Sequence, residues 1–150
     1  MTLEEKVMSE MKEAMKSKNE ASLRGLRAIK AEIIKAKTDP GSGGVVSAEG
    51  ELKLLQKLVK QRKDSLGIFR QQNRADLAQK EEEEIAVIEK FLPRQLSEAE
   101  IREKVKAAIA ETGAAGPQDM GKVMGVVTRQ VAGQADGKVV SGIVKELLAG

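Results

Sequence analysis

Apolar residues recur at intervals of three and four along most of the chain, which is the spacing of one face of an α-helix. No segment alternates apolar and polar residues with the period of two that a half-buried strand shows. Polar or glycine-rich breaks divide the helical pattern into successive segments. The sequence therefore predicts an all-α protein, with N-terminal helical hairpins or a bundle followed by a small C-terminal three-helix domain.

Two helices are predicted before the first long loop. Thr2 is a candidate N-cap, and Glu5 stands three residues later, as in a capping box. A polar break at 17–19 ends the first helix, and an Asp-Pro pair followed by glycines opens a loop at 39–47. The residues predicted to face inward are Leu3, Val7, Met11 and Met15 in the first helix, and Leu23, Leu26, Ile29 and Ile33 in the second.

Two further helices are predicted between this loop and Pro93. Ser47 is a candidate cap for the third helix, and the fourth begins at Asn73 or Arg74. Because proline disfavours helix at the preceding residue, we place a domain boundary here, between an N-terminal α-helical domain at 1–94 and a tail at 95–150. The predicted inward positions are Leu52, Leu55, Val59, Arg62, Leu66 and Phe69 in the third helix, and Leu77, Ile85, Ile88 and Leu92 in the fourth.

The tail is predicted to contain three helices. Ser97 and Glu100 have the spacing of a capping box, and Pro117 suits the first turn of the next helix. A helical hairpin follows, in which Gly133 can take the positive φ of a helix C-terminus and Asp136 can cap the last helix. Its inward positions are Met120, Val123, Met124, Val127 and Val131, then Val140, Ile143, Val144, Leu147 and Leu148.

Composition limits the core and the location of the protein. Apolar residues make up 41% of the 150 residues, and Phe69 and Phe91 are the only aromatic ones, so the core is expected to be aliphatic. Cysteine is absent, which fits a reducing compartment, and we expect a cytoplasmic protein. No stretch is long and apolar enough to span a membrane, so no membrane partner is expected.

Charge is distributed unevenly although the formal net charge is only +3. Seven cations and one acid lie between positions 53 and 74, and six acids and one lysine lie between 76 and 89. A basic helix followed by an acidic one indicates two neighbours that pair in an antiparallel hairpin, or else a basic interaction surface. The candidate surface residues are Lys53, Lys57, Lys60, Lys63, Arg70 and Arg74.

Arg62 occupies an inward position of the third helix, where a guanidinium is tolerated only if it is fully paired. Glu81 and Glu84 lie three apart on the next helix and are predicted to face Arg62 and Lys63 as structural ion pairs. The alternative use of these carboxylates is a magnesium or general-acid site. That alternative lacks a surrounding set of ligands, so the ion pairs are the favoured interpretation.

No catalytic apparatus is evident. The chain has no His, Cys, Tyr or Trp, which excludes Ser-His-Asp and Cys-His nucleophile systems and the usual zinc and iron ligand sets. The segment from Gly133 to Lys138 lacks the spacing of a phosphate-binding loop, and no strand leads into it. We therefore predict no catalytic residues, no metal site and no small-molecule cofactor.

Two glycines stand four residues apart in the predicted sixth helix, at 121 and 125. The favoured interpretation is a close approach of neighbouring helices; the alternative is a bare helix face that lets an RNA backbone approach. Because the tail has no aromatic residue for base stacking, such contact would be made with backbone and shape. The candidate RNA-binding residues are Gly121, Lys122, Gly125, Arg129, Gly133, Asp136, Gly137, Lys138 and Lys145.

Several motifs in a fixed order give the chain a family resemblance. They are the residues from Leu26 to Ile33, KQRKDS at 60–65, NRADLAQKE at 73–81, LPRQLSEAEI at 92–101, MGKVMG at 120–125 and GQADGKVV at 133–140. In these motifs the chain resembles the YqeY-like proteins, which are related to the tail domain of GatB, a subunit of the tRNA-dependent amidotransferases. The loop from Asp39 to Gly50 departs from the pattern.

The resemblance implies a function that the residues alone do not. In GatB the tail is a helical domain that contacts tRNA, while the carbon–nitrogen ligase chemistry, with glutamine as amide donor, belongs to other domains. The resemblance therefore implies a non-catalytic accessory module that contacts tRNA or another RNA. The alternative is an adaptor that binds an acidic, translation-related protein through the basic helix at 53–74.

Overall fold

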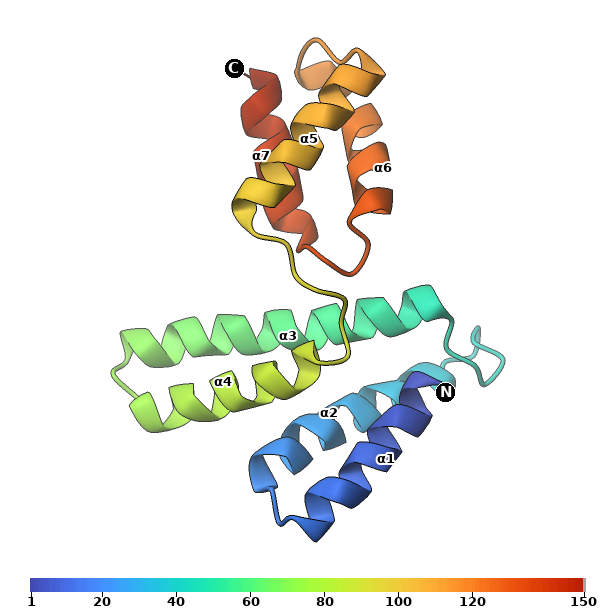
Figure 1. Ribbon diagram of the computed structural model, residues 1–150, viewed down its shortest axis with the longest axis vertical. Helices are drawn as coiled ribbons and strands as arrows, with labels where there is room; N and C mark the ends of the chain where they lie inside the picture. The colour runs from blue at the N-terminus through green and yellow to red at the C-terminus, as the bar shows by residue number, and fades with distance from the viewer. Residues whose placement is uncertain (150) are drawn as a thin grey trace. The chain divides into compact units, whose positions relative to one another are not determined.

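The computed structural model describes residues 1–149 and contains α-helices, one short 3-10 turn and no strand within that range, which confirms the all-α prediction. Contacts divide the chain into two compact units, one from Met1 to Leu92 and one from Pro93 onward. Figure 1 labels the helices of both units. They are α1 (Leu3–Lys16), α2 (Glu20–Lys37), α3 (Ala48–Gln71), α4 (Ala75–Glu89), α5 (Glu98–Thr112), the turn η1 (Pro117–Asp119), α6 (Met120–Gln130) and α7 (Gly137–Ala149).

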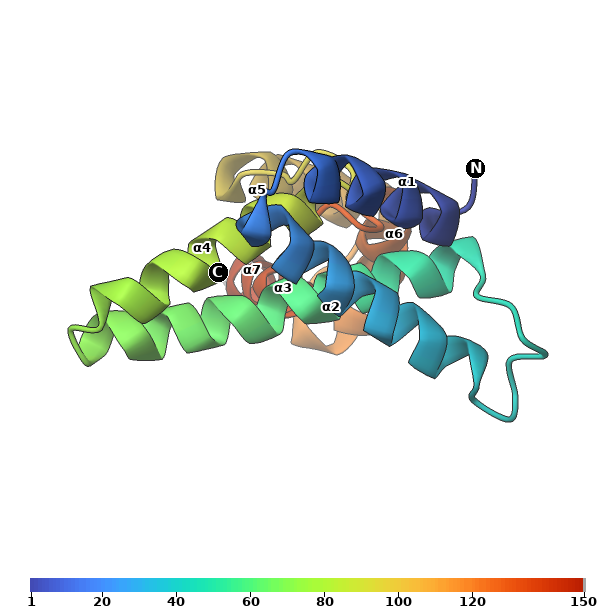
Figure 2. The same ribbon diagram turned by 90° about the horizontal axis from the view of Figure 1, so that it is seen from below.

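The first unit is built from two helical hairpins. Helices α3 and α4 lie side by side, as do α1 and α2, and α2 packs mainly on α4 and also on α3 (Figures 1 and 2). The side chains buried between these helices are aliphatic, as the composition predicts. They include Val7, Leu26, Ile29, Leu55 and Ile88, each at most 2% exposed.

Side-chain caps fix where several of these helices begin. The Thr2 hydroxyl accepts a hydrogen bond from the Glu5 amide at 3.2 Å, and the Ser47 hydroxyl accepts one from the Gly50 amide at 3.0 Å. Asn19 caps α2 in the same way, through the amide of Ser22. Such caps satisfy helix-terminal N–H groups that have no partner within the helix, and a cap contributes about 1 kcal/mol.

The inward positions of α1 and α3 differ in part from those predicted. Met15 is 59% exposed, so its placement in the core was wrong; Ala14 is buried instead and turns the core-facing side of α1 away from Met15. On α3, Leu54 and Leu58 are buried together with Leu55 and Val59. The apolar face of α3 is therefore broader than a single stripe, because this helix packs against both α2 and α4.

One glycine determines how closely α2 and α4 approach. A Cβ atom placed on Gly25 would lie 2.9 Å from both Cβ and Cγ1 of Val87, closer than real Cβ atoms come to other heavy atoms. Val87 is buried on α4, and its Cβ is fixed by the backbone. Gly25 is therefore required by packing, a role that the sequence analysis did not assign to it.

The second unit is a three-helix cluster of α5, α6 and α7. The capping box at its start is complete: the Ser97 hydroxyl accepts from the Glu100 amide, and the Glu100 carboxylate accepts from the Ser97 amide. Gly113 ends α5 with a φ of +68°, and Pro117 opens η1. The buried core is formed by Ile101, Val105, Ala108, Val123, Val127, Val131, Val140, Ile143, Val144 and Leu148.

The turn between α6 and α7 is held by the segment that leads into α5. The Gln95 side chain donates to the Gly133 carbonyl at 2.8 Å, and the Leu96 amide donates to the Gln134 carbonyl at 2.9 Å. The Gln134 side chain in turn donates to the carbonyl of Arg94. Residues 94–96, which are far from this turn in sequence, thus hold the end of α6 and the start of α7 in place.

Among residues 1–149, no helix is long and apolar enough to cross a membrane.

Candidate nucleic-acid interface

The two glycines of α6 face open space. Gly121 and Gly125 are exposed, and a Cβ atom placed on either would have no neighbour within 4 Å. The favoured interpretation, in which they permit a close approach of helices, is therefore wrong for the described structure. The inward-facing side of α6 is formed by valines and methionines instead, which leaves the glycines on the outer side.

These exposed glycines lower the stability of α6. A glycine inside a helix costs about 0.5–1 kcal/mol relative to alanine, because it loses more backbone entropy on folding. Gly125 lies in the middle of α6, where this cost applies in full. Since no packing contact offsets the cost, the packing of this unit does not explain why a glycine stands there.

Two cations flank the bare face of α6. The Lys122 side chain is 71% exposed, and its Nζ lies 3.9 Å from an oxygen of Asp119, a loose pair that water screens. Arg129 is exposed and its Nε donates to the Gly125 carbonyl at 3.0 Å, so its side chain folds back toward that glycine. Both cations are accessible to an anionic partner.

Helix α7 repeats this arrangement of a glycine between cations. Lys138, Gly142 and Lys145 follow one another at spacings of four and three residues and thus share one face, and all three are exposed. A Cβ atom on Gly142 would meet nothing within 4 Å. Gly142 was not among the predicted contact residues, although its place between cations three and four residues away matches that of Gly125.

Three other candidate residues lie at the start of α7 and in the turn before it. Gly133 is buried with a φ of +76°, and its carbonyl is already bonded to Gln95. An oxygen of Asp136 accepts from the Lys138 amide at 2.8 Å. Gly133 and Asp136 therefore shape the turn, while Gly137 is exposed with open space around it.

The basic helix α3 is largely neutralised by carboxylates of its own unit. Four of the six candidate surface cations form ion pairs, and the other two, Lys60 and Lys63, form none within residues 1–149. The four pairs are Lys53–Glu49, Lys57–Glu32, Arg70–Glu82 and Arg74–Asp76. This pairing reduces the positive potential that an acidic partner of α3 would meet.

The acidic stretch of α4 joins three helices. Arg62 Nε lies 3.4 Å from Glu84, and a guanidinium nitrogen of Arg24 on α2 lies 2.7 Å from Glu83. Arg24 Nε is buried at 4.0 Å from Glu84, so their attraction is electrostatic. Burial and the neighbouring Glu84 raise the pKa of Glu81, and Arg62 opposes this shift. Arg24 was not predicted to be part of this network.

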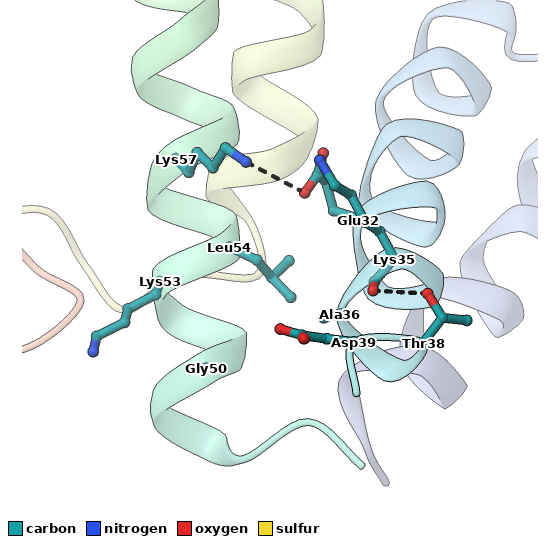
Figure 3. A pocket seen from close by; sticks show the side chains of 9 residues that line it. All are labelled: Glu32, Lys35, Ala36, Thr38, Asp39, Gly50, Lys53, Leu54 and Lys57. Carbon is teal, nitrogen blue, oxygen red and sulfur yellow. Dashed lines mark hydrogen bonds and ion pairs between the residues drawn. The ribbon is translucent and has the colours of Figure 1, made fainter. Parts of the chain in front are cut away.

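The first unit also has an open pocket of about 490 Å³ between the end of α2 and the start of α3 (Figure 3). One of its lysines is paired with a carboxylate that also lines the pocket: Lys57 and Glu32 point toward one another, with Nζ and the carboxylate oxygen 3.8 Å apart. Lys53 points away from the pocket. Within residues 1–149, no group of three acidic side chains is arranged to hold a metal ion.

Comparisons with known proteins agree with the motif order. The family model described as Yqey-like protein matches residues 4–148. The chain is 33% identical over 147 residues to "Altered inheritance of mitochondria protein 41, mitochondrial" of Pyrenophora tritici-repentis, which covers 95% of this chain and 79% of that protein. It is 34% identical over 125 residues to the protein of the same name from Clavispora lusitaniae, covering 81% of this chain and 69% of that one.

Proposed function

This chain belongs to the YqeY-like protein family, and we propose on that premise that it is a non-catalytic module that contacts RNA through α6 and α7. The proposed ligand is the sugar–phosphate backbone of tRNA or another folded RNA. The proposed contact residues are the exposed glycines Gly121, Gly125 and Gly137, to which the structure adds Gly142, and the cations Lys122, Arg129, Lys138 and Lys145.

The observation that carries the proposal is the bare face of α6. An exposed glycine in the middle of a helix reduces stability, yet Gly125 has no intramolecular contact that requires it. Absence of a side chain lets another backbone come close, and exposed cations beside it favour an anionic backbone. Lys122 and Arg129 supply those cations on α6.

The proposed contact is electrostatic and modest in strength. Four exposed cations across α6 and α7 neutralise at most about four phosphates, so the logarithm of the binding constant falls with a slope of roughly −3 to −4 against the logarithm of salt concentration. The tail has no aromatic residue on which bases could stack, so little sequence preference is expected. Recognition by backbone and shape favours folded RNA over B-form DNA.

Binding of the purified chain to bulk tRNA, compared with duplex DNA of equal mass at two salt concentrations, tests this function. Lys122→Glu combined with Arg129→Glu should weaken tRNA binding by at least about tenfold, because two attractive contacts become repulsive. Lys104→Glu combined with Lys106→Glu changes the net charge equally on α5 of the same unit and serves as the control. An equal loss in both double variants would mean that net charge alone binds the RNA.

A link to tRNA-dependent amidotransferases is a finer part of the same proposal. It rests on the family's relation to the GatB tail and assigns no carbon–nitrogen ligase chemistry to this chain.

If the protein binds neither tRNA nor DNA, the adaptor hypothesis replaces the RNA proposal. Pull-down with a charge-reversed α3, carrying Lys60→Glu and Lys63→Glu, then tests whether an acidic protein partner depends on that helix.

The compartment also stays a prediction. The absence of cysteine led us to expect a cytoplasmic protein. The names of the relatives place those proteins in mitochondria and do not support that expectation. A reducing mitochondrial matrix is equally compatible with a chain without cysteine, and imaging of the tagged full-length protein in its own cells distinguishes the two compartments.

A further inference from the structure

Exposed apolar side chains gather on one face of the α1–α2 hairpin. Met8, Met15 and Ile34 are 42%, 59% and 49% exposed, and Met11 is half-buried between the core and this face. At 100° per residue, the three methionines of α1 fall within an arc of about 60°. The other exposed large apolar residues of the first unit, apart from the terminal Met1, are Val45 in a loop and Ile68 on α3.

The register of the hairpin places Ile34 beside this methionine face. Lys37 Nζ lies 3.2 Å from a carboxylate oxygen of Glu4, which fixes the antiparallel alignment of α1 and α2. Counted from this pair at equal rise per residue, Met8 lies opposite Ile33, the residue before Ile34, and Met15 lies opposite Leu26, the residue before Arg27. Figure 1 shows the two helices next to one another, and Figure 2 shows them close at the loop that joins them and diverging toward the start of α1. The exposed apolar residues of α1 and α2 therefore lie on neighbouring outer faces of the two helices, which together form the outer face of the α1–α2 hairpin.

The edges of this outer face are basic. Lys12 follows the methionine face around α1, and Arg27 and Lys30 lie along the same side of α2. None of the three forms an ion pair within residues 1–149, whereas Lys37 and Lys16 are paired with Glu4 and Glu13. The outer face thus combines adaptable apolar side chains with unpaired cations at its edges.

We propose that the outer face of the α1–α2 hairpin docks an amphipathic helix of another protein, one whose apolar face is flanked by acidic residues. A third helix can pack across two neighbouring antiparallel helices, and methionine side chains adapt their shape to different partners. Acidic flanks complement Lys12, Arg27 and Lys30. A second copy of this chain would bring the same cations together. This inference concerns α1 and α2 only and does not depend on RNA contact by the tail.

The test uses two synthetic helical peptides of about 20 residues with the same leucine face, one flanked by glutamates and one by lysines. Each is titrated into the full chain carrying ¹³C-labelled methionine methyl groups. We expect the glutamate peptide to bind at least about tenfold more tightly than the lysine peptide. Signals of Met8, Met11 and Met15 should shift, and those of Met120 and Met124, which lie in α6, should not.

Two matched variants locate the contact. Ile34→Glu should weaken binding of the glutamate peptide by at least about tenfold, because it places a charge among the apolar side chains of the outer face. Ile68→Glu, at an equally exposed apolar residue of α3, should leave the affinity within about twofold. Equal binding of the two peptides, equal effects of the two variants, or no binding of the glutamate peptide would each overturn the proposal.

A lipid surface is tested in parallel. Vesicles of phosphatidylcholine with one-third phosphatidylserine are sedimented with the chain and with the Ile34→Glu variant. Binding to these vesicles that Ile34→Glu abolishes, without binding of the glutamate peptide, would overturn the proposal in favour of a membrane surface. Peptide binding without vesicle binding supports docking of a helix on the outer face of the hairpin.

Discussion

Glycines serve opposite purposes in the two units. In the first unit, Gly25 lies where α2 crosses α4, and a Cβ atom there would come within 2.9 Å of Val87. In the second unit, Gly121 and Gly125 lie on the outer side of α6 with nothing within 4 Å. The first glycine allows two helices to pack, whereas the other two reduce helix stability, and no neighbouring atom occupies the space that a side chain there would fill.

The difference shows how a helical glycine is to be interpreted. Sequence spacing does not distinguish a crowded helical glycine from an uncrowded one, and in α6 it suggested close helix packing. The atoms around the missing side chain decide the question, since only a crowded glycine is explained by the fold. An uncrowded one in the middle of a helix directs attention to a contact outside the chain, which is the basis of the RNA proposal.

The largest expected effect comes from Gly25→Ala. The added methyl group would press on Val87 Cβ, which cannot move without its backbone, so we expect the free energy of unfolding to fall by about 1–3 kcal/mol. Urea unfolding followed by circular dichroism measures this loss. Hydrogen exchange should locate it in α2 and α4 and leave α6 and α7 unchanged; an unaltered stability would remove the packing role of Gly25.

The opposite sign is expected for Gly125→Ala. Replacing an uncrowded glycine in mid-helix should raise the free energy of unfolding by about 0.5–1 kcal/mol. Gly67→Ala is the matched control, because Gly67 is exposed inside α3 and also has nothing within 4 Å. Both variants should be stabilised to a similar extent in thermal unfolding. A destabilised Gly125→Ala would mean that α6 is more crowded than the structure shows.

A smaller effect, which depends on pH, is expected in the second unit. The hydrogen bond from Arg94, aided by that from the Ser97 amide, lowers the pKa of Glu100 to about 2. A lowered pKa stabilises the fold above the ordinary value of about 4.5, and this contribution is lost as pH falls toward 2. Glu100→Gln should therefore lower the melting temperature at pH 7 and lose that effect near pH 2. If the melting temperatures of Glu100→Gln and the unaltered chain differed equally at pH 7 and near pH 2, ionisation of Glu100 would not be the source of the stabilisation.

The smallest effect is expected for an acid of the first unit with the opposite shift. Burial, helped by Glu84, raises the pKa of Glu81. Ionised Glu81 therefore lowers the stability of the fold above the raised pKa, and this loss is absent at pH values below the ordinary pKa of a glutamate. Glu81→Gln should raise the melting temperature slightly at pH 7 and not at pH 4. A lower melting temperature at pH 7 would mean that attraction to Arg62 outweighs burial.

Local signals in the sequence predicted most of the fold. Thr2, Ser47, Ser97 and Asp136 cap helices as expected, and the apolar spacing identified every α-helix, because caps and helical periodicity involve residues only a few positions apart. Met15 was wrongly placed in the core, and the packing role of Gly25 was not predicted. The environments of both residues depend on helices that are distant in sequence.

The candidate site was predictable only in part. The positions of Lys122, Arg129 and the α6 glycines followed from spacing, but their exposure did not, since it depends on which side of α6 faces α5 and α7. Arg24 could not be assigned to the acidic stretch of α4 from sequence, because its partners come from another hairpin. Gly142 has the same local pattern as Gly125 and was identifiable from spacing.

The central claim is that the uncrowded glycines of α6 are a contact surface for RNA. Its most direct test is the dissociation constant for bulk tRNA of Gly121→Ala with Gly125→Ala, compared with that of Gly67→Ala, at one low salt concentration. We expect the α6 variant to bind at least about tenfold more weakly despite its higher stability, because two methyl groups would hold the RNA backbone away from the helix, and the α3 variant to bind as the unaltered chain does. Equal tRNA affinity in the three proteins would contradict the account.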